Sequence, residues 1–285
     1  MDNADTSSQK LRAPGDFPVR FVSAVVYLVL TVACLMIHTY SALVMLMVTA
    51  GICAHEFYYM LARDARVLNE LIGTISAVLY PAVIHFFGLE GALVQTVATL
   101  LVLMIWYVFD AKAGIGDFAI SFFGALYCGL LLSGIIIIRE TLPAPWGAIL
   151  ALGLFASTWL NDVFAYGVGS LFGKHKMCPN ISPKKSWEGF AAGMVGSVAA
   201  WIGISFIPGV TMVWWLAVIC GIICGGMGVL GDLAESRIKR NTGFKDSGTI
   251  MPGHGGLLDR CDSIFLASVT GCILLIAFGC VPYVF

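Results

Sequence analysis

The chain has 285 residues, of which 59% are hydrophobic and only 12% are charged, and its formal net charge is −1. Soluble domains carry about 25% charged residues, so this composition excludes an ordinary soluble protein and predicts an all-α integral membrane protein. The nine cysteines form no CxxC motif, so neither a zinc site nor a disulfide framework is indicated.

Residues 1–18 form a polar tail. They lack the pattern of a cleaved signal peptide, because acidic residues precede the basic ones and no clear small-residue cleavage site follows. Apolar segments then follow one another along the chain, each about long enough to cross hydrocarbon roughly 30 Å thick. We therefore expect a polytopic bundle of about nine transmembrane helices, with an N-terminal set in 19–145 and a C-terminal region in 146–285. The segments are 20–38, 41–61, 71–87, 91–109, 117–138, 146–170, 189–207, 213–230 and 263–283.

The basic residues fall almost entirely on one side of this arrangement. Counting along the segments places fifteen of the sixteen Lys and Arg residues on the side of the N-terminus and only Arg139 on the other. Cytoplasmic loops carry an excess of Lys and Arg, so the N-terminal tail is predicted to be cytoplasmic and the C-terminus outside. The two long loops, 171–188 and 231–262, share the cytoplasmic side and hold nearly all the remaining polar residues. Function is therefore expected at the cytoplasmic face.

One acid lies inside an apolar segment. Asp162 follows Asn161 in the sixth segment, where a charged side chain costs about 2.5–3.5 kcal/mol to insert. We expect Asp162 to face the bundle interior and to have a partner. It is either a structural, hydrogen-bonded acid or part of a metal or substrate site, and the functional interpretation is favoured.

The loop 171–188 contains two basic motifs, Gly173–Lys176 and Ser182–Gly189. Ser186 is expected to cap the next helix, which would place Lys184 and Lys185 just before a helix N-terminus, where anions bind well. Alternatively, these lysines contact lipid headgroups, and the spacing does not decide between the two interpretations.

The stretch from Asp232 to Asp262 is the most charged part of the chain. Asp232 and Glu235 are three residues apart, as are Asp259 and Asp262, so on helices the members of each pair share a face. Two carboxylate pairs beside several cations predict a site for Mg²⁺ and a polyphosphate, because oxygen ligands suit the metal and Lys and Arg suit the phosphates.

Another acid, Glu56, follows His55 within the second apolar segment. Position 59 is Tyr, so the zinc-binding HExxH motif is not formed. The sequence favours a buried or interfacial pair between Glu56 and His55.

The segment 236–262 resembles the signature of the phosphatidate cytidylyltransferases, also called CDP-diacylglycerol synthases. It reads SRIKRNTGFKDSGTIMPGHGGLLDRCD, and it departs from the usual choices only at Met251 and Cys261. The motifs NDVFAYGVG from Asn161, SPKKSWEG from Ser182 and GDLAES from Gly231 are also similar to that family. The resemblance covers about residues 150–263, whereas the N-terminal half is similar only in being a helical membrane bundle.

The resemblance implies a reaction in which CTP and phosphatidate give CDP-diacylglycerol and pyrophosphate, with Mg²⁺ alone or together with a second cation. It also implies a polar cavity facing the cytoplasm and open to lipid, in a homodimer in the inner (cytoplasmic) membrane. The expected partners are CTP, phosphatidate and the bilayer, and no nucleic acid.

The site is expected to combine acids that hold the metal with cations that hold phosphates. Asp232, Asp259 and Asp262 are predicted as the catalytic and metal-binding acids, with Asp162 and Glu235 as lesser metal candidates. No general base is assigned, because a phosphate monoester is largely ionised near pH 7. The predicted substrate-binding residues are Lys184, Lys185, Ser236, Lys239, Arg240, Lys245, Asp246, His254, Gly255, Gly256 and Arg260.

Two other functions are alternatives. A CTP-dependent kinase acting on a lipid alcohol would transfer the γ-phosphoryl group and release CDP. A secondary transporter would use Asp162 as its ion or proton site, but the chain shows no related halves, and its polar residues crowd one face rather than the bilayer midplane.

Overall fold

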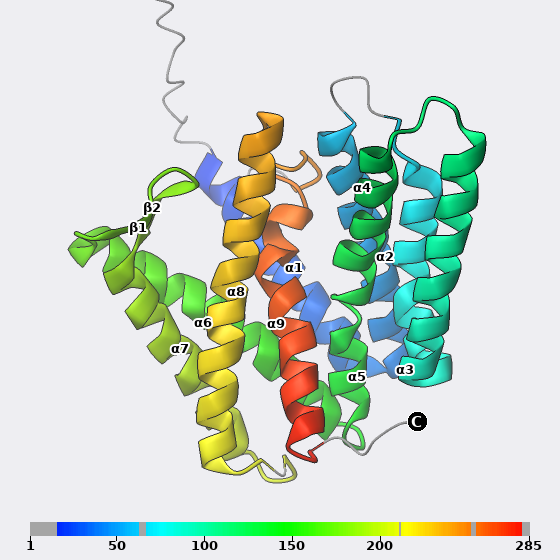
Figure 1. The fold of residues 1–285 in the computed structure, drawn as a ribbon. Coiled ribbons are helices and arrows are strands. Elements are labelled where there is room, and N and C mark those ends of the chain that lie inside the picture. The colour runs from blue at the N-terminus through cyan, green and yellow to red at the C-terminus, as the bar shows by residue number, and fades with distance from the viewer. Residues whose placement is uncertain (1–15, 63–66, 211, 252–254, 281–285) are drawn as a thin grey trace, which may run out of the picture.

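The protein is described by a computed structural model that covers residues 16–62, 67–210, 212–251 and 255–280. It is an all-α bundle, as predicted, with one small β-hairpin at one end (Figure 1). The elements are α1 (Asp16–Ile37), α2 (Thr39–Leu61), α3 (Glu70–Phe109), α4 (Ile115–Ala125), the π-helical turn η1 (Leu126–Leu130), α5 (Gly134–Glu140), α6 (Trp146–Phe172), β1 (Lys176–Cys178), β2 (Ser182–Ser186), α7 (Trp187–Ser205), α8 (Trp214–Thr242) and α9 (Leu258–Ala277).

The helix α3 is a hairpin of two helices. Its backbone departs from helical geometry at Gly88, where φ is 64° and ψ is −158°. The two halves then run side by side, because Gln95 donates to the carbonyl of Ser76 (2.8 Å) and the Tyr80 hydroxyl lies 2.9 Å from that of Thr96. These halves correspond to the predicted segments 71–87 and 91–109, and Pro81 does not end the first of them.

Among the described residues, seven helices are long and apolar enough to cross a membrane when α3 is counted once. A shorter apolar helix, Phe21–Ile37, belongs to α1. The count of nine spanning helices therefore stays a prediction. Large apolar side chains are exposed on the outside of the bundle, such as Phe109, Phe87 and Leu93, as expected for surfaces that contact lipid.

The connections that carry the described basic residues share one end of the bundle (Figure 1). The β-hairpin, the end of α8 and the start of α9 all lie there, together with the turn between α3 and α4. Arg139, the exception in sequence, is a buried residue of α5. Its Nε donates to the carbonyl of Leu35 (2.9 Å) and its Nη1 bonds to Thr39, so this cation ties α5 to the turn between α1 and α2.

Two connections differ from their predicted form. The helix α8 continues past the apolar segment to Thr242, and α9 begins at Leu258, so the predicted loop 231–262 is reduced to 243–257. The reason is local: neither glycine nor proline occurs after Gly231 until Gly243, which adopts a φ of 74° and ends the helix. The predicted loop 171–188 contains the antiparallel strands β1 and β2.

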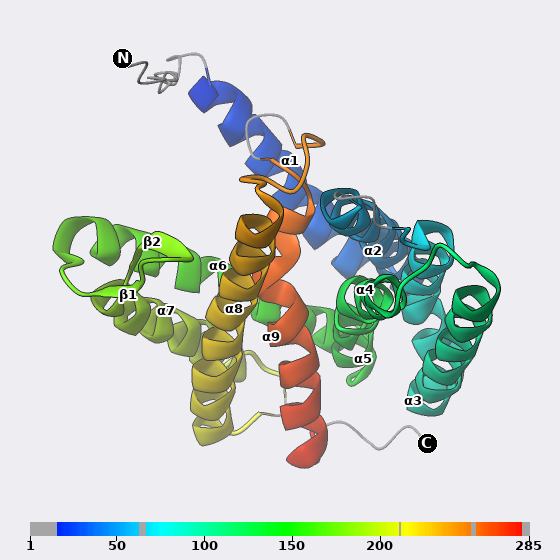
Figure 2. The ribbon, with the colours of Figure 1, turned by 45° about the horizontal axis from the view of Figure 1, so that its top comes forward.

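The helices α8 and α9 stand side by side between α6–α7 on one flank and α2–α5 on the other (Figure 2). They approach closely because Gly231 of α8 faces the backbone carbonyl of Asp262, where a Cβ would not fit. The acidic residues of both helices are therefore brought to the same level of the bundle.

Replacing Gly88 by Ala tests the α3 hairpin. The backbone conformation at Gly88 is one that only glycine adopts readily, so Gly88→Ala is expected to destabilise the protein by about 1–3 kcal/mol. Thermal unfolding in detergent measures the change. Gly203→Ala is the matched control, because a Cβ there meets no neighbour within 4 Å. An unchanged unfolding temperature for Gly88→Ala would contradict the hairpin geometry.

Candidate active site

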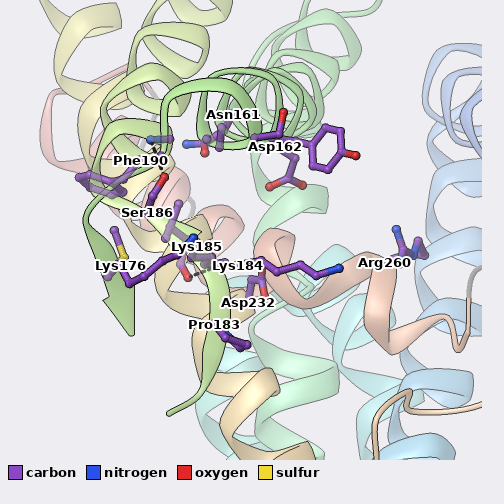
Figure 3. A pocket seen from close by; sticks show the side chains of 18 residues that line it. Asn161, Asp162, Lys176, Pro183, Lys184, Lys185, Ser186, Phe190, Asp232 and Arg260 are labelled. Atoms are coloured by element: carbon purple, nitrogen blue, oxygen red, sulfur yellow. Dashed lines mark hydrogen bonds and ion pairs between the residues drawn. The ribbon is translucent and has the colours of Figure 1, made fainter. Parts of the chain in front are cut away.

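A cavity of about 670 Å³ opens at the basic end of the bundle, between α6, the β-hairpin, α8 and α9 (Figure 3). It combines carboxylates with cations, in agreement with the sequence analysis. The lining residues are Asn161, Asp162, Ala165, Tyr166, Gly169, Ser170, Gly173, Lys176, Met177, Pro183, Lys184, Lys185, Ser186, Gly189, Phe190, Val229, Asp232 and Arg260.

The β-hairpin forms one wall of the cavity and is fixed to the start of α7. The predicted cap is confirmed, because the Ser186 hydroxyl accepts a hydrogen bond from the Gly189 amide (3.2 Å). His175 is held against Glu188, with 2.6 Å between its Nδ1 and the carboxylate, and the Trp187 amide donates to the His175 carbonyl. The strand β2 therefore presents its lysines to the cavity immediately before a helix N-terminus.

The cavity contains two of the predicted metal-binding acids, Asp162 and Asp232. Asp162 is exposed on the wall that α6 provides. Asp232 pairs with Lys185, with 2.7 Å between Nζ and Oδ2, and accepts a hydrogen bond from the Ser236 hydroxyl (3.2 Å). Arg260 stands on α9, across the cavity from the hairpin.

A third acid, Asp262, lies buried behind this wall. The carboxylates of Asp232 and Asp162 both act on it electrostatically. Neighbouring carboxylates repel one another when ionised, so this group of acids would be stabilised by a bound cation.

Asp259 belongs to a different group of residues. Its Oδ1 lies 2.6 Å from the Nζ of Lys239, and its Oδ2 accepts hydrogen bonds from the amides of Ser247 (2.9 Å) and Gly256 (2.8 Å). Lys239 also pairs with the fully buried Glu235, at 2.5 Å. The two predicted carboxylate pairs are thus divided: Asp232 and Asp262 lie at or behind the cavity, and Glu235 and Asp259 share Lys239.

The predicted pair of His55 and Glu56 is wrong. His55 is exposed and pairs with Glu70, with 2.5 Å between its Nδ1 and the carboxylate. Glu56 is buried and accepts hydrogen bonds from Ser247, Leu257 and Leu258. Sequence reasoning missed this contact, although an acid within an apolar segment is the same signal that singled out Asp162.

The other predicted residues lie around the connection 243–257. Arg240 donates to the Ile181 carbonyl (3.4 Å), which joins α8 to the hairpin. Lys245 and Asp246 are exposed and do not line the cavity. Gly255 has a φ of 88°, and its carbonyl accepts a hydrogen bond from the Met251 amide (2.9 Å).

His254, another predicted substrate-binding residue, lies outside the described residues. The lining also includes residues that the site prediction omitted, among them Tyr166, Lys176 and Phe190.

The donor set suits a hard cation. Within the described ranges, no group of three or more His, Cys, Asp or Glu side chains stands close enough to hold a metal ion by itself. Mg²⁺, however, is commonly bound by one or two carboxylates together with substrate phosphates and water. Asp162 and Asp232, with Asp262 behind them, fit that mode of binding.

Comparisons with known proteins agree with the motifs. Residues 18–278 match the model of a family described as "Cytidylyltransferase family". The chain is 38% identical over 205 residues to a phosphatidate cytidylyltransferase of Mycobacterium bovis, which covers 66% of this chain and 65% of that protein. It is 33% identical over 240 residues to that of Staphylococcus saprophyticus, covering 79% and 91%. The chain therefore spans slightly less than two thirds of the length of the Mycobacterium bovis relative.

The shared lysine gives a stability prediction. Lys239→Met leaves Glu235 buried without its cation, so it is expected to destabilise the protein by about 3–5 kcal/mol. Arg237→Met is the control, because Arg237 is exposed on the same helix. Unfolding in mixed micelles measures both changes. Equal stability of the two variants would show that the Lys239 network does not support the fold.

Proposed function

The chain belongs to the cytidylyltransferase family, and on that premise we propose that it transfers the cytidylyl group of CTP to phosphatidate, giving CDP-diacylglycerol and pyrophosphate. The observation that carries the proposal is the cavity, in which Lys184, Lys185 and Arg260 surround Asp162 and Asp232. Cations for phosphates and oxygen ligands for a divalent metal are the groups that phosphoryl and nucleotidyl transfer require.

The reaction needs little help from a base. The phosphate monoester of phosphatidate is largely ionised near pH 7, so its oxygen is already a nucleophile. That oxygen attacks the α-phosphorus of CTP and forms a new P–O bond. The bond between the α-phosphorus and the oxygen bridging to the β-phosphorus breaks, and pyrophosphate leaves with the electron pair. The main obstacle is the approach of two anions.

The cations of the cavity lower this obstacle. Lys184 and Lys185 lie on β2 just before the N-terminus of α7. The triphosphate would therefore be stabilised by the lysine charges and by the backbone N–H groups and dipole at the start of that helix. Arg260 faces them from α9 and would hold the second phosphate group. Positioning and charge compensation together supply the catalysis in this account.

Asp162, Asp232 and Asp262 would hold Mg²⁺, alone or with a second cation. When bound there, such a metal would supply positive charge to offset the charge that develops on the leaving pyrophosphate. We assign Asp259 a positioning role instead, because both of its oxygens are already bonded within the protein.

The proposal also includes the orientation of the protein in the membrane. The basic end of the bundle faces the cytoplasm, where CTP is available, and the acyl chains of phosphatidate stay in the bilayer while the headgroup enters the cavity. The protein would lie in the cytoplasmic membrane as a homodimer, with the N-terminus inside and the C-terminus outside.

Product analysis tests the proposed reaction. The purified protein is incubated in detergent micelles with phosphatidate, Mg²⁺ and CTP labelled at the α-phosphorus. We expect the label to enter a lipid while pyrophosphate is released. Label that remains in CDP would indicate the kinase reaction, and a folded protein without turnover would contradict enzymatic function; either result would overturn the proposal.

The acids of the cavity give a second prediction. Asp232→Asn is expected to lower kcat by about a hundredfold or more, or about 2.7 kcal/mol, because one ligand for the metal is lost. Unfolding should be unchanged, since Asp232 is partly exposed. Asp259→Asn is expected to lower both kcat and stability. Full activity of purified Asp232→Asn would remove Asp232 from the site.

The hairpin lysines give a third prediction. Lys184→Ala is expected to raise the KM for CTP by about tenfold, the value of one charge-assisted hydrogen bond. Lys174→Ala is the matched control, because Lys174 precedes the same hairpin but does not line the cavity. If the two variants show the same CTP dependence, Lys184 does not contact the triphosphate.

A further inference from the structure

We propose that Glu56, in the N-terminal half of the chain, is a positioning residue for the active site, because it joins Ser247 to Leu257 and Leu258 at the start of α9. The expected effect of Glu56 on kcat rests on the proposed function. The expected effect of Glu56 on the stability of the start of α9 rests only on hydrogen bonds within the protein. The proposal assigns a role in catalysis to a helix that the motifs do not include.

The contacts of Glu56 all point to this connection. Its Oε2 accepts hydrogen bonds from the Leu258 amide (2.8 Å) and the Ser247 hydroxyl (3.0 Å), and its Oε1 accepts one from the Leu257 amide (3.1 Å). Glu56 itself is 3% exposed. A buried carboxylate is costly unless it is fully hydrogen-bonded, so these three donors define where the side chain and the connection must lie.

The position of the carboxylate also explains two glycines of the signature. A Cβ on Gly248 or on Gly256 would collide with the carboxylate of Glu56. Gly248 does not adopt a positive φ, so its backbone conformation does not require glycine. The requirement at Gly248 is therefore space for Glu56, a residue almost two hundred positions earlier in the chain.

Asp259 accepts hydrogen bonds from the same segments of the chain as Glu56. Asp259 bonds to the amides of Ser247 and Gly256, and Glu56 bonds to the Ser247 hydroxyl and the two amides that follow Gly256. Two carboxylates thus join the two ends of the connection, at 247 and at 256–258. One of them comes from α9 itself and the other from α2.

The consequence reaches the cavity through the first turn of α9. Arg260 lines the cavity and follows Leu258 by two positions, and Asp262 follows Leu258 by four, about one turn. An anion at the N-terminus of a helix stabilises that end, so Glu56 holds the turn that carries both side chains. Loss of Glu56 would loosen this turn while leaving the hairpin lysines, which it does not contact, in place.

The test compares full-length wild-type protein with Glu56→Gln and the control Glu70→Gln. The substituted amide at position 56 would retain only one acceptor oxygen for two backbone amides, whereas Glu70 lies on the exposed surface beside His55. Amide hydrogen exchange and steady-state turnover are measured on the same detergent-solubilised samples. Exchange needs no substrate, so it reports on Glu56 even if the proposed reaction is wrong.

We expect Glu56→Gln to accelerate exchange at residues 255–260 by about tenfold, the equivalent of one charge-assisted hydrogen bond, and to lower kcat by a similar factor. Exchange in the β-hairpin should not change, and the KM for CTP should stay within about twofold because Lys184 and Lys185 are unaffected. Glu70→Gln should match the wild-type protein. Unchanged exchange at 255–260, or acceleration spread over every helix, would overturn the inference. An inactive wild-type protein with the expected exchange pattern would overturn only the proposed function.

A second pair of variants keeps the test decisive if Glu56→Gln does not fold. Gly248→Ala should lower kcat by placing a methyl group against the Glu56 carboxylate. Adding Glu56→Asp withdraws the carboxylate by one methylene, so the double variant should be more active than the product of the two single effects predicts. Independent, multiplicative losses would overturn the inference.

Discussion

The pairing of buried charge between α8 and α9 is the constraint on which the site depends. Buried charges in an apolar bundle need partners of opposite charge, and here Lys239 pairs with both Glu235 and Asp259. The close approach at Gly231 sets the two helices at one level, so Asp232 lines the cavity and Asp262 lies buried behind it. Each of the two helices therefore carries one acid at or behind the cavity, Asp232 or Asp262, and one acid that pairs with Lys239, Glu235 or Asp259.

The acids of this region therefore fall into two groups, those that line the cavity and those that are paired within the protein. Asp162, Asp232 and the hairpin lysines line the cavity, whereas both oxygens of Asp259 and of Glu56 are bonded within the protein and Glu235 is buried against Lys239. Family membership agrees with an enzyme and speaks against the transporter alternative. The charged cavity lies at the end of the bundle that carries the β-hairpin and the start of α9, which is where the proposed nucleotide and lipid headgroup would bind.

Much of the fold was predictable because apolar length and loop charge are local signals. The Ser186 cap, the two halves of α3 and the residues that line the cavity from β2 and α8 follow from such signals. The sequence did not predict that Asp232 and Glu235, or Asp259 and Asp262, would face different neighbours. Residues three apart differ by about 60° around a helix, so the two members of a pair can contact different groups. The partner of Glu56 was unpredictable for another reason: its contact with Ser247 spans 191 positions, and one sequence contains no signal for such a pairing.

The central claim is that the cavity between α6, the β-hairpin, α8 and α9 receives CTP. Photoaffinity labelling tests it most directly: a CTP analogue with an azide on its base is irradiated with the full-length protein in micelles, and the labelled peptides are mapped. The account predicts labelling within residues 161–190, or beside Asp232 and Arg260, that excess CTP abolishes. CTP-sensitive labelling confined to α2–α5, or labelling that CTP does not displace, would contradict it.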